Sequence, residues 1–230
     1  MTDLLTDLQG QKFKTICADP PWDHSDGIGF SFSGERHRDG WGRSDTDKIH
    51  HLGYSTMALV DIEALPVAEC ADSDSMLYLW TTSRFLWAAH GVARKWGFNP
   101  GPVLVWCKPQ NQGLCGGTWL SNVEFIVTAK RGKPKATGKV GSRWFTWPRK
   151  YIDGHMANGW KPEAFQDMVE TVSPGPYLEL FARRTRLNWV TIGNEADGMD
   201  VKDSLILLAQ GKHPCYGVEK HGESRHEQDV

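Results

Sequence analysis

The stretch Thr15-Ile16-Cys17-Ala18-Asp19-Pro20-Pro21-Trp22 joins a short apolar run to an acid, two prolines and a tryptophan. The apolar part predicts a buried β-strand. The prolines cannot continue a central strand, because they lack the backbone N–H that such a strand donates. The stretch therefore predicts a strand that ends at Ala18 and carries the Asp19 carboxylate just beyond its carboxyl end.

Five further apolar runs, each bounded by turn residues, predict that this strand belongs to a larger sheet. Most runs are continuous rather than alternating, which is typical of strands covered on both faces in a parallel or mostly parallel sheet. Amphipathic stretches between them predict helices over residues 60–71, 84–96 and 162–172. Because strands and helices alternate, we expect an α/β fold with a doubly wound sheet that binds ligands beyond its strands' carboxyl ends. The predicted strands cover residues 14–18, 76–80, 103–107, 123–129, 177–181 and 189–193.

The size and composition of the chain fit one soluble α/β domain. Of its 230 residues, 40% are hydrophobic and 23% charged. No apolar run approaches the roughly 18 residues that a membrane span requires. The five cysteines lack a CxxC pair and the nine histidines are scattered, so we expect neither a disulfide framework nor a metal site. We expect a single domain over residues 1–210, a polar tail over 211–230 and, because residues 1–10 lack a secretory pattern, a cytoplasmic location.

The residues after the first strand are suited to holding an amino group. Two prolines remove two backbone donors, so we expect the Pro20 carbonyl to be offered to a ligand without competition from local N–H groups. Adenine N6 carries two protons; Asp19 could accept one and Pro20 the other, which would direct the nitrogen lone pair at a methyl donor. Trp22 offers a stacking face for a base taken out of its stack, so Asp19, Pro20, Pro21 and Trp22 are the candidate catalytic residues. The alternative is a plain strand-to-turn connection with an anchoring tryptophan.

Seven further motifs, in their order along the chain, resemble those of the MT-A70 family of N6-adenine methyltransferases. The resemblance covers roughly residues 14–198, and a chain of this length is similar to the bacterial or phage branch of the family. The motifs are Tyr54-Ser55-Thr56-Met57, Leu104-Val105-Trp106-Cys107-Lys108, Asn122-Val123-Glu124, Lys161-Pro162-Glu163, Ser173-Pro174-Gly175, Glu179-Leu180-Phe181-Ala182-Arg183 and Gly193-Asn194-Glu195.

The resemblance implies a Rossmann-like, class I methyltransferase that uses S-adenosyl-L-methionine, with the catalytic motif ahead of the cofactor half in a permuted order. It places Lys161 on the methionine carboxylate of the cofactor and Glu124 in the catalytic pocket. Without the family match, Phe181 reads as a core residue, Arg183 as a surface residue and Asn194 as a turn cap. The implied cofactor-binding residues are Asp19, Lys161, Phe181, Arg183, Asn194 and Glu195.

The chain also departs from the family pattern at two points. Gly159-Trp160 precedes the Lys-Pro pair, where eukaryotic relatives have Ser-His or Ser-Arg. The connection from Arg183 to Asn194 is short, so ribose contacts made by this loop in relatives are either missing or supplied by other residues. The candidates to supply them are Arg184, Thr185 and Asn188.

Two polar stretches are candidates for holding nucleic acid. Residues 130–150 hold eight basic residues and no acid, inside a predicted basic aromatic insertion over 130–160, so phosphate neutralisation and base stacking could occur together. The alternative is a solvated basic loop with its aromatic side chains folded into the core. Residues 23–53 follow the catalytic motif and are expected to form an active-site loop. The candidate nucleic-acid-binding residues are Arg36, Arg38, Arg43, Lys133, Lys135, Lys139, Arg143, Trp144 and Trp147.

We therefore expect an enzyme that methylates adenine N6 in nucleic acid, with DNA favoured over RNA. One alternative is a catalytically inactive, nucleic-acid-binding member of the family, and another is a methyltransferase acting on RNA adenine. A third is a methyltransferase for a small molecule or protein amine, against which the basic aromatic insertion argues. We expect a monomer or homodimer, without a membrane or metal partner, in the cytoplasm of a bacterial or phage-infected cell.

Overall fold

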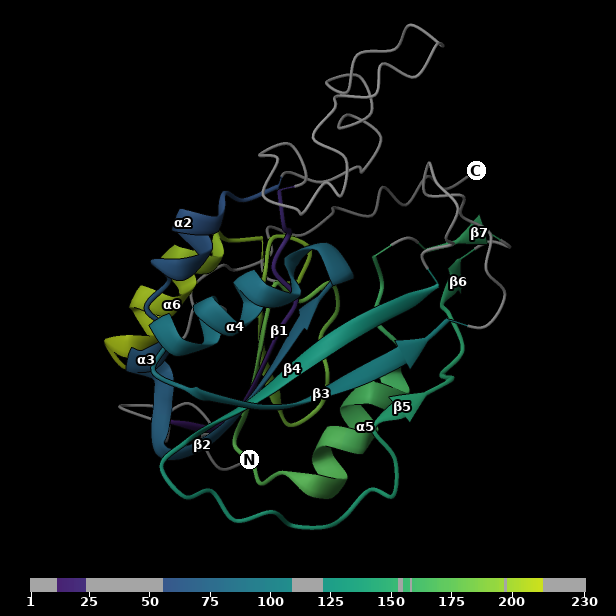
Figure 1. Ribbon diagram of the computed structural model, residues 1–230. Coiled ribbons are helices and arrows are strands. Elements are labelled where there is room, and N and C mark those ends of the chain that lie inside the picture. The colour runs from purple at the N-terminus through teal and green to yellow at the C-terminus, as the bar shows by residue number, and fades with distance from the viewer. Residues whose placement is uncertain are drawn as a thin grey trace, which may run out of the picture.

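A computed structural model describes residues 12–23, 56–108, 122–152, 155–157, 159–196 and 198–212. Its described part is a seven-stranded sheet in the order β5-β3-β4-β2-β1-β8-β9, covered by helices on both faces (Figure 1). A separate two-stranded ribbon is formed by β6 (Tyr151–Ile152) and β7 (His155–Met156). The strands of the large sheet are β1 (Phe13–Ala18), β2 (Ala71–Thr81), β3 (Asn99–Cys107), β4 (Val123–Arg131), β5 (Trp144–Phe145), β8 (Tyr177–Leu180) and β9 (Trp189–Ile192).

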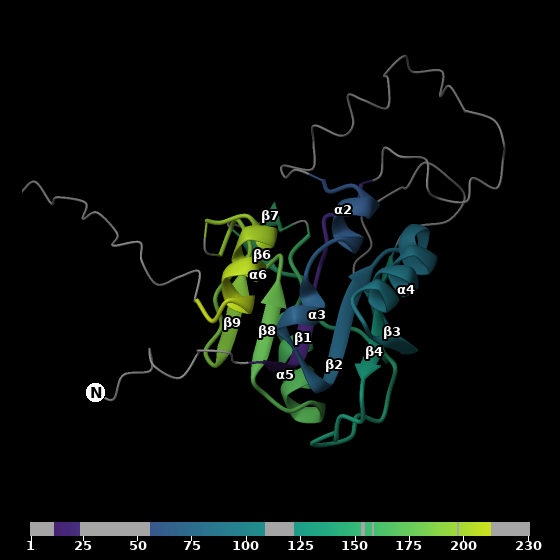
Figure 2. The same cartoon turned by 90° about the vertical axis from the view of Figure 1, so that its left-hand side faces the viewer.

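The sheet is mixed, and one strand runs against its neighbours. The strands β2, β1, β8 and β9 are parallel, whereas β4 pairs antiparallel with both β2 and β3. Figure 2 shows the arrowheads of β2 and β8 pointing one way and that of β4 the other. All six predicted strands are present, and the α/β fold class is confirmed. The reversal of β4 has a direct consequence for the site, because it brings the amino end of β4 to the edge where β1 and β2 end.

Four helices, α2 (Leu59–Glu63), α3 (Val67–Cys70), α4 (Leu86–Lys95) and α6 (Val201–Ala209), cover one face of the sheet, and α5 (Glu163–Val172) covers the other (Figure 2). The helix predicted over residues 60–71 is in fact two short helices. Pro66 lies between them, and proline removes a helical hydrogen bond and disfavours helix in the residue before it. Asp200 caps α6, which was not predicted, by accepting hydrogen bonds from the backbone N–H groups of Lys202 and Asp203.

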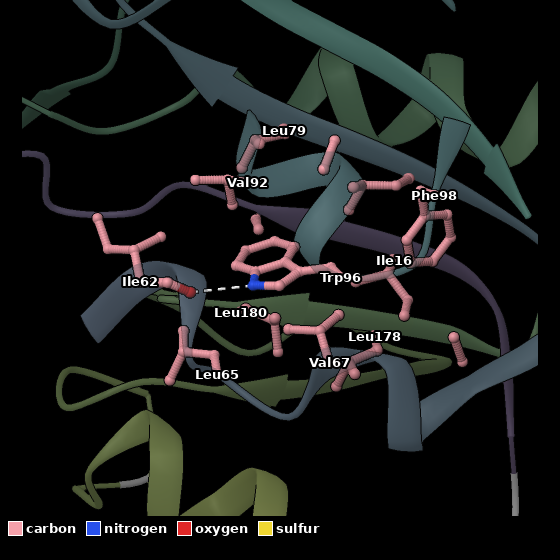
Figure 3. Close-up of a cluster of buried hydrophobic side chains, with 14 of the residues drawn as sticks. Ile16, Ile62, Leu65, Val67, Leu79, Val92, Trp96, Phe98, Leu178 and Leu180 are labelled. Carbon is pink, nitrogen blue, oxygen red and sulfur yellow. Dashed lines mark hydrogen bonds between the residues drawn. The ribbon is translucent and has the colours of Figure 1, made fainter. Parts of the chain in front are cut away.

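Two apolar layers hold the helices to the sheet. On the face of α2 to α4, Trp96 is 1% exposed and its indole N–H donates to the Ile62 carbonyl at 2.9 Å (Figure 3). On the face of α5, the rings of Trp80 and Phe165 meet edge to face at 4.8 Å between centroids. Burying such large aromatic side chains on both sides is a main source of the fold's stability. The carboxyl edge of the sheet is therefore held rigidly between two packed layers.

Candidate active site

A cleft of about 940 Å³ opens at the carboxyl edge of β1, β2 and β8. Its walls come from segments that are far apart in the sequence but adjacent in the sheet, as expected for ligand sites of open α/β sheets. Nine of the predicted residues line it together: Asp19, Pro20, Pro21, Trp22, Lys161, Phe181, Arg183, Asn194 and Glu195. The cofactor and catalytic candidates therefore share a single cavity.

Asp19 and the two prolines form a tight turn at the end of β1. The backbone N–H of Trp22 donates to the Pro20 carbonyl at 2.9 Å, and that of Met57 donates to the Pro21 carbonyl at 2.8 Å. The expectation that no local N–H would compete for the Pro20 carbonyl is wrong. A carbonyl oxygen has two lone pairs, so Pro20 retains the capacity to accept one more hydrogen bond.

Trp22 is a packed residue that supports the turn. It is 6% exposed, its indole N–H donates to the Trp80 carbonyl at 3.1 Å, and its ring stacks on Phe85 with centroids 5.4 Å apart. These contacts match the anchoring role that the sequence left open as an alternative. Trp22 is among the residues that line the cleft, but little of its surface is available for stacking on a base.

A cluster of alternating charges forms the floor of the cleft. The Lys161 Nζ lies 2.7 Å from Asp19 Oδ2 and 3.2 Å from Glu124 Oε2, while Lys108 Nζ lies 2.5 Å from Glu124 Oε1. The Lys161 ammonium also lies 5.2 Å from the centre of the Trp80 ring. Because β4 is antiparallel to β2, its second residue, Glu124, reaches the same edge as Asp19 at the end of β1.

Burial and pairing shift the proton affinities of these groups. Burial raises the pKa of Asp19, and the Lys161 ammonium offsets this effect only in part. Burial alone would also raise the pKa of Glu124, but Lys161 and Lys108 outweigh it and hold that pKa below its usual range. Burial alone would lower the pKa of Lys161, but the two carboxylates outweigh it and raise that pKa. Lys161 therefore stays charged at physiological pH, and Asp19 is a stronger proton acceptor than an exposed aspartate.

The opposite wall of the cleft follows β8 and β9. Phe181, just beyond β8, has a left-handed backbone (φ 61°), which is uncommon for a bulky residue and turns the chain sharply at the cleft. Arg183 Nε lies 3.5 Å from Glu195 Oε1. A Cβ on Gly193 would lie 2.6 Å from the Ala182 carbonyl oxygen, so only glycine lets these two strand ends approach so closely.

Gly159, two residues before Lys161, also allows a close approach between two segments of the cleft. Its backbone has φ +77°, and a Cβ there would lie 2.8 Å from Arg183 Nη2. The absence of a side chain lets the Arg183 guanidinium lie against the backbone two residues before Lys161. The Gly159-Trp160 departure from the family pattern is thus matched to the position of Arg183.

The cleft also contains residues that sequence reasoning had not assigned to a site. Lys108 belongs to the Leu104-Val105-Trp106-Cys107-Lys108 motif, which by itself indicated no role for it, although its position directly after the end of β3 was a usable signal. The amino end of α6 contributes Asp200, Val201 and Lys202, and its aspartate cap was the sequence signal for that helix end. Of the three proposed substitutes for ribose contacts, Arg184, Thr185 and Asn188, none is among the described residues that line the cleft.

The predicted basic aromatic insertion is divided between two regions. Lys133, Lys135 and Lys139 are exposed near the opposite edge of the sheet, since Arg131 pairs with Ser75 near the start of β2. The backbone N–H of Lys133 donates to Asp74 Oδ1 at 2.6 Å, which fixes the loop at that edge. These lysines and the cleft are therefore not brought together.

The middle of the insertion contains the edge strand β5. The Arg143 carbonyl accepts a hydrogen bond from Val105, and Trp144 is 62% exposed. The Trp147 carbonyl accepts from the Trp106 indole N–H at 2.9 Å, and its ring stacks on Phe145 at 4.2 Å. Trp147 is thus folded into the aromatic layer, whereas Trp144 remains available at the surface. Arg36, Arg38, Arg43 and most of the predicted 23–53 loop lie outside the described residues.

Among the described residues, no three acidic, histidine or cysteine side chains come close enough together to hold a metal ion. Among the same residues, no helix is both long and apolar enough to cross a membrane.

Comparison with known proteins identifies relatives over most of the chain. Residues 13–195 match the family model MT-A70. The chain is 28% identical to the N(6)-adenosine-methyltransferase MT-A70-like protein of Drosophila melanogaster, over 88% of this chain but only 30% of that protein. It is 27% identical to the type II methyltransferase M.MunI of a Mycoplasma species, over 90% of this chain and 86% of that protein. It is 26% identical to the human N(6)-adenosine-methyltransferase catalytic subunit METTL3, over 85% of this chain and 30% of that protein.

Proposed function

This chain belongs to the MT-A70 family, and we propose from this that it transfers a methyl group from S-adenosyl-L-methionine to adenine N6 in nucleic acid. One observation carries the proposal: Asp19 at the end of β1 is joined through Lys161 to Glu124 inside the cleft that also holds the candidate cofactor residues. The chain spans less than a third of the eukaryotic relatives it matches, so their whole activity is carried over here only as a proposal.

The residues of the cleft suit the proposed cofactor. A cleft of about 940 Å³ is large enough for a nucleoside-sized ligand. The Lys161 ammonium can pair with an amino-acid carboxylate, while Phe181, Asn194 and Glu195 offer an apolar surface and polar groups for a nucleoside. The close approach of Gly193 to Ala182 keeps this wall free of a further side chain. When bound, S-adenosyl-L-methionine supplies a methyl group on an electron-poor sulfonium.

The turn after β1 would hold the amine that receives the methyl group. Asp19 accepts one N6 proton, and the remaining lone pair of the Pro20 carbonyl accepts the other, so that the nitrogen lone pair is drawn out of the ring. Once methylated, the nitrogen is acidic and loses its proton to Asp19 or water. The raised pKa of Asp19 suits this acceptor role.

Lys161 has a second partner, Glu124, that keeps its ammonium in place when Asp19 is engaged with the base. Lys108 pairs with the other oxygen of Glu124 and so fixes that carboxylate from the opposite side. Removal of the Glu124 carboxylate would take from the Lys108 ammonium its partner in the cleft floor and would leave Lys161 with Asp19 alone. Glu124 and Lys108 therefore act by holding Lys161.

DNA is the favoured substrate in this proposal because the chain covers 86% of a type II methyltransferase, but only 30% of two eukaryotic adenosine methyltransferases that it matches. The predicted basic aromatic insertion carries exposed basic residues that can neutralise a phosphate backbone.

The proposal is tested by incubating the protein with labelled cofactor and matched DNA or RNA oligonucleotides, then digesting to nucleosides and identifying the product. We expect N6-methyladenine from DNA. Asp19→Asn should lower kcat by about 10²–10⁴-fold, because it removes the proton acceptor at the reacting nitrogen. The control is Asp72→Asn, which makes the same change near the start of β2, at the edge of the sheet opposite the cleft. This variant should retain activity.

Three other outcomes would each overturn one part of the proposal. N4-methylcytosine would overturn the choice of base while keeping the amine chemistry of Asp19. Methylation of RNA alone would overturn the choice of DNA. Full activity in Asp19→Asn would remove Asp19 from the mechanism.

A further inference from the structure

The position of Lys161 is fixed through its backbone as well as through its ammonium. Lys161 stands directly before Pro162, the residue that caps α5, and so lies where a loop enters a helix. Its side chain reaches across the cleft floor to Asp19 and Glu124, and its ammonium also donates to the Gly159 carbonyl at 3.4 Å. A lysine side chain is flexible, so accurate placement of its ammonium needs a well-held main chain.

Arg184 supplies that hold from the neighbouring loop. Its Nη1 donates to the Lys161 carbonyl at 3.1 Å, and its Nη2 donates to Gln166 Oε1 on α5 at 2.8 Å. Its guanidinium also lies 5.8 Å from the ring centre of Trp160. The planar guanidinium thus fastens the Trp160-Lys161 segment to the helix that follows it.

The chain of contacts continues into the sheet. Gln166 is 1% exposed, and its Nε2 donates to Glu179 Oε2 in β8 at 2.6 Å. Glu179 is paired in register with Cys17 of β1, two residues before Asp19. Arg184, Gln166 and Glu179 therefore connect the backbone of Lys161 with the pair of strands whose ends carry Asp19 and Phe181.

We propose that Arg184 is a positioning residue for Lys161: it clamps the Lys161 backbone to α5 and β8, so that the ammonium is held between Asp19 and Glu124 and ready for an anionic group of the cofactor. The clamp itself is independent of the proposed reaction. Only the last clause, on the cofactor, rests on the proposed function.

The same loop offers a matched control. Arg186 also binds α5, with Nη2 2.7 Å from Asp167 Oδ1 and Nε 2.9 Å from Glu170 Oε1. Its described contacts do not include the segment around Lys161. Arg184→Met and Arg186→Met both remove a guanidinium that ties this loop to α5, but only the first breaks the contact with Lys161.

The first measurement needs no cofactor. The rate at which acetic anhydride acetylates Lys161 in the free protein is followed by mass spectrometry of its peptide. In Arg184→Met we expect labelling about fivefold faster than in wild type, the size expected when one charge-assisted hydrogen bond is lost. Arg186→Met should stay within about twofold of wild type, since a loss of general stability alone does not favour Lys161. Equal rates in wild type and Arg184→Met, or equal acceleration in both variants, would overturn the proposal.

The second measurement is the dissociation constant of S-adenosylhomocysteine by calorimetry. We expect it to rise about tenfold in Arg184→Met, less in Arg184→Lys because the ammonium can still donate to one of the two acceptors, and not in Arg186→Met. If wild type does not bind this ligand while the labelling contrast is seen, the proposed function fails and the clamp stands. If wild type binds it and Arg184→Met binds it equally well, the role toward the cofactor fails.

Discussion

Glu179 is an acid inside the fold whose proton affinity is set by its surroundings. Burial raises its pKa to about 7, although Arg184, Gln166 and Arg186 pull it down and Asp19 pushes it further up. In the unfolded chain a glutamate has a pKa of about 4.3. Between these two values the folded protein holds a proton that the unfolded chain has released, so this residue makes the folded state less stable as the pH rises.

Glu179→Gln should remove this pH dependence. We expect the free energy of unfolding of the variant, relative to wild type, to increase by about 1–2 kcal/mol between about pH 5 and pH 7.5, after allowance for partial solvent exposure. Glutamine keeps an oxygen that accepts from Gln166, so the packing is preserved. Urea unfolding at both pH values measures the difference. A constant difference between the two proteins would mean that Glu179 is ionised across the whole range.

At the scale of elements, α6 illustrates how a helix end shapes the cleft. Asp200 accepts the first backbone N–H groups of α6 with Oδ1 at 2.8 Å from Lys202 N, and the same residue lines the cleft. Asp200→Ala should lower the free energy of unfolding by about 1 kcal/mol, the usual worth of such a cap. Asp200→Asn keeps the capping oxygen and is the control. Urea unfolding of both variants checks this, and equal losses in the two would show that charge rather than capping matters.

Elements were predictable from sequence to the extent that their cause is local. The six apolar runs became strands, because burial of continuous apolar residues depends little on direction or neighbours. The reversed direction of β4 was not predictable, since an apolar run carries no information on its orientation. The break at Pro66 was predictable from the proline itself, but the longer amphipathic pattern favoured one continuous helix.

The residues of the site were predictable where they belong to a family motif. Lys161 and Glu124 were found through family motifs, but their shared contact depends on the antiparallel β4 and could not come from spacing. Arg184 was one of three candidates for ribose contacts, beside the alternative that these contacts are missing, whereas its guanidinium donates hydrogen bonds to Lys161 and Gln166. Trp22 was expected to offer a free ring, but the fold supplied Phe85 as its stacking partner.

At the scale of the whole molecule, the basic loop and the cleft lie at opposite ends of β4. Arg131 lies seven positions after Glu124 in β4, which corresponds to about 24 Å at about 3.4 Å per residue. Lys133, Lys135 and Lys139 lie beyond that end and are exposed. A nucleic acid that touches both regions must therefore extend well past the target base.

Changing Lys133, Lys135 and Lys139 together to alanine should consequently affect long substrates only. We expect the dependence of log affinity on log salt to become shallower by up to about 3 for a duplex of about 30 base pairs, and to stay unchanged for one of about 8. Fluorescence anisotropy over a salt series measures both slopes, and the short duplex serves as the internal control. An unchanged slope for the long duplex would exclude this loop from the nucleic-acid surface.

Under the proposed function, the charge cluster also makes catalysis depend on the completion of folding. Asp19 lies near one end of the described chain, Lys161 belongs to a segment more than a hundred positions later, and Glu124 comes from between them. Contacts of such high sequence separation form only when the whole sheet has assembled. During synthesis, the emerging chain carries Asp19 long before Lys161. Under the proposed function, a chain that ends before Lys161 would therefore lack methyl-transfer activity, and that activity would require the whole sheet to be assembled.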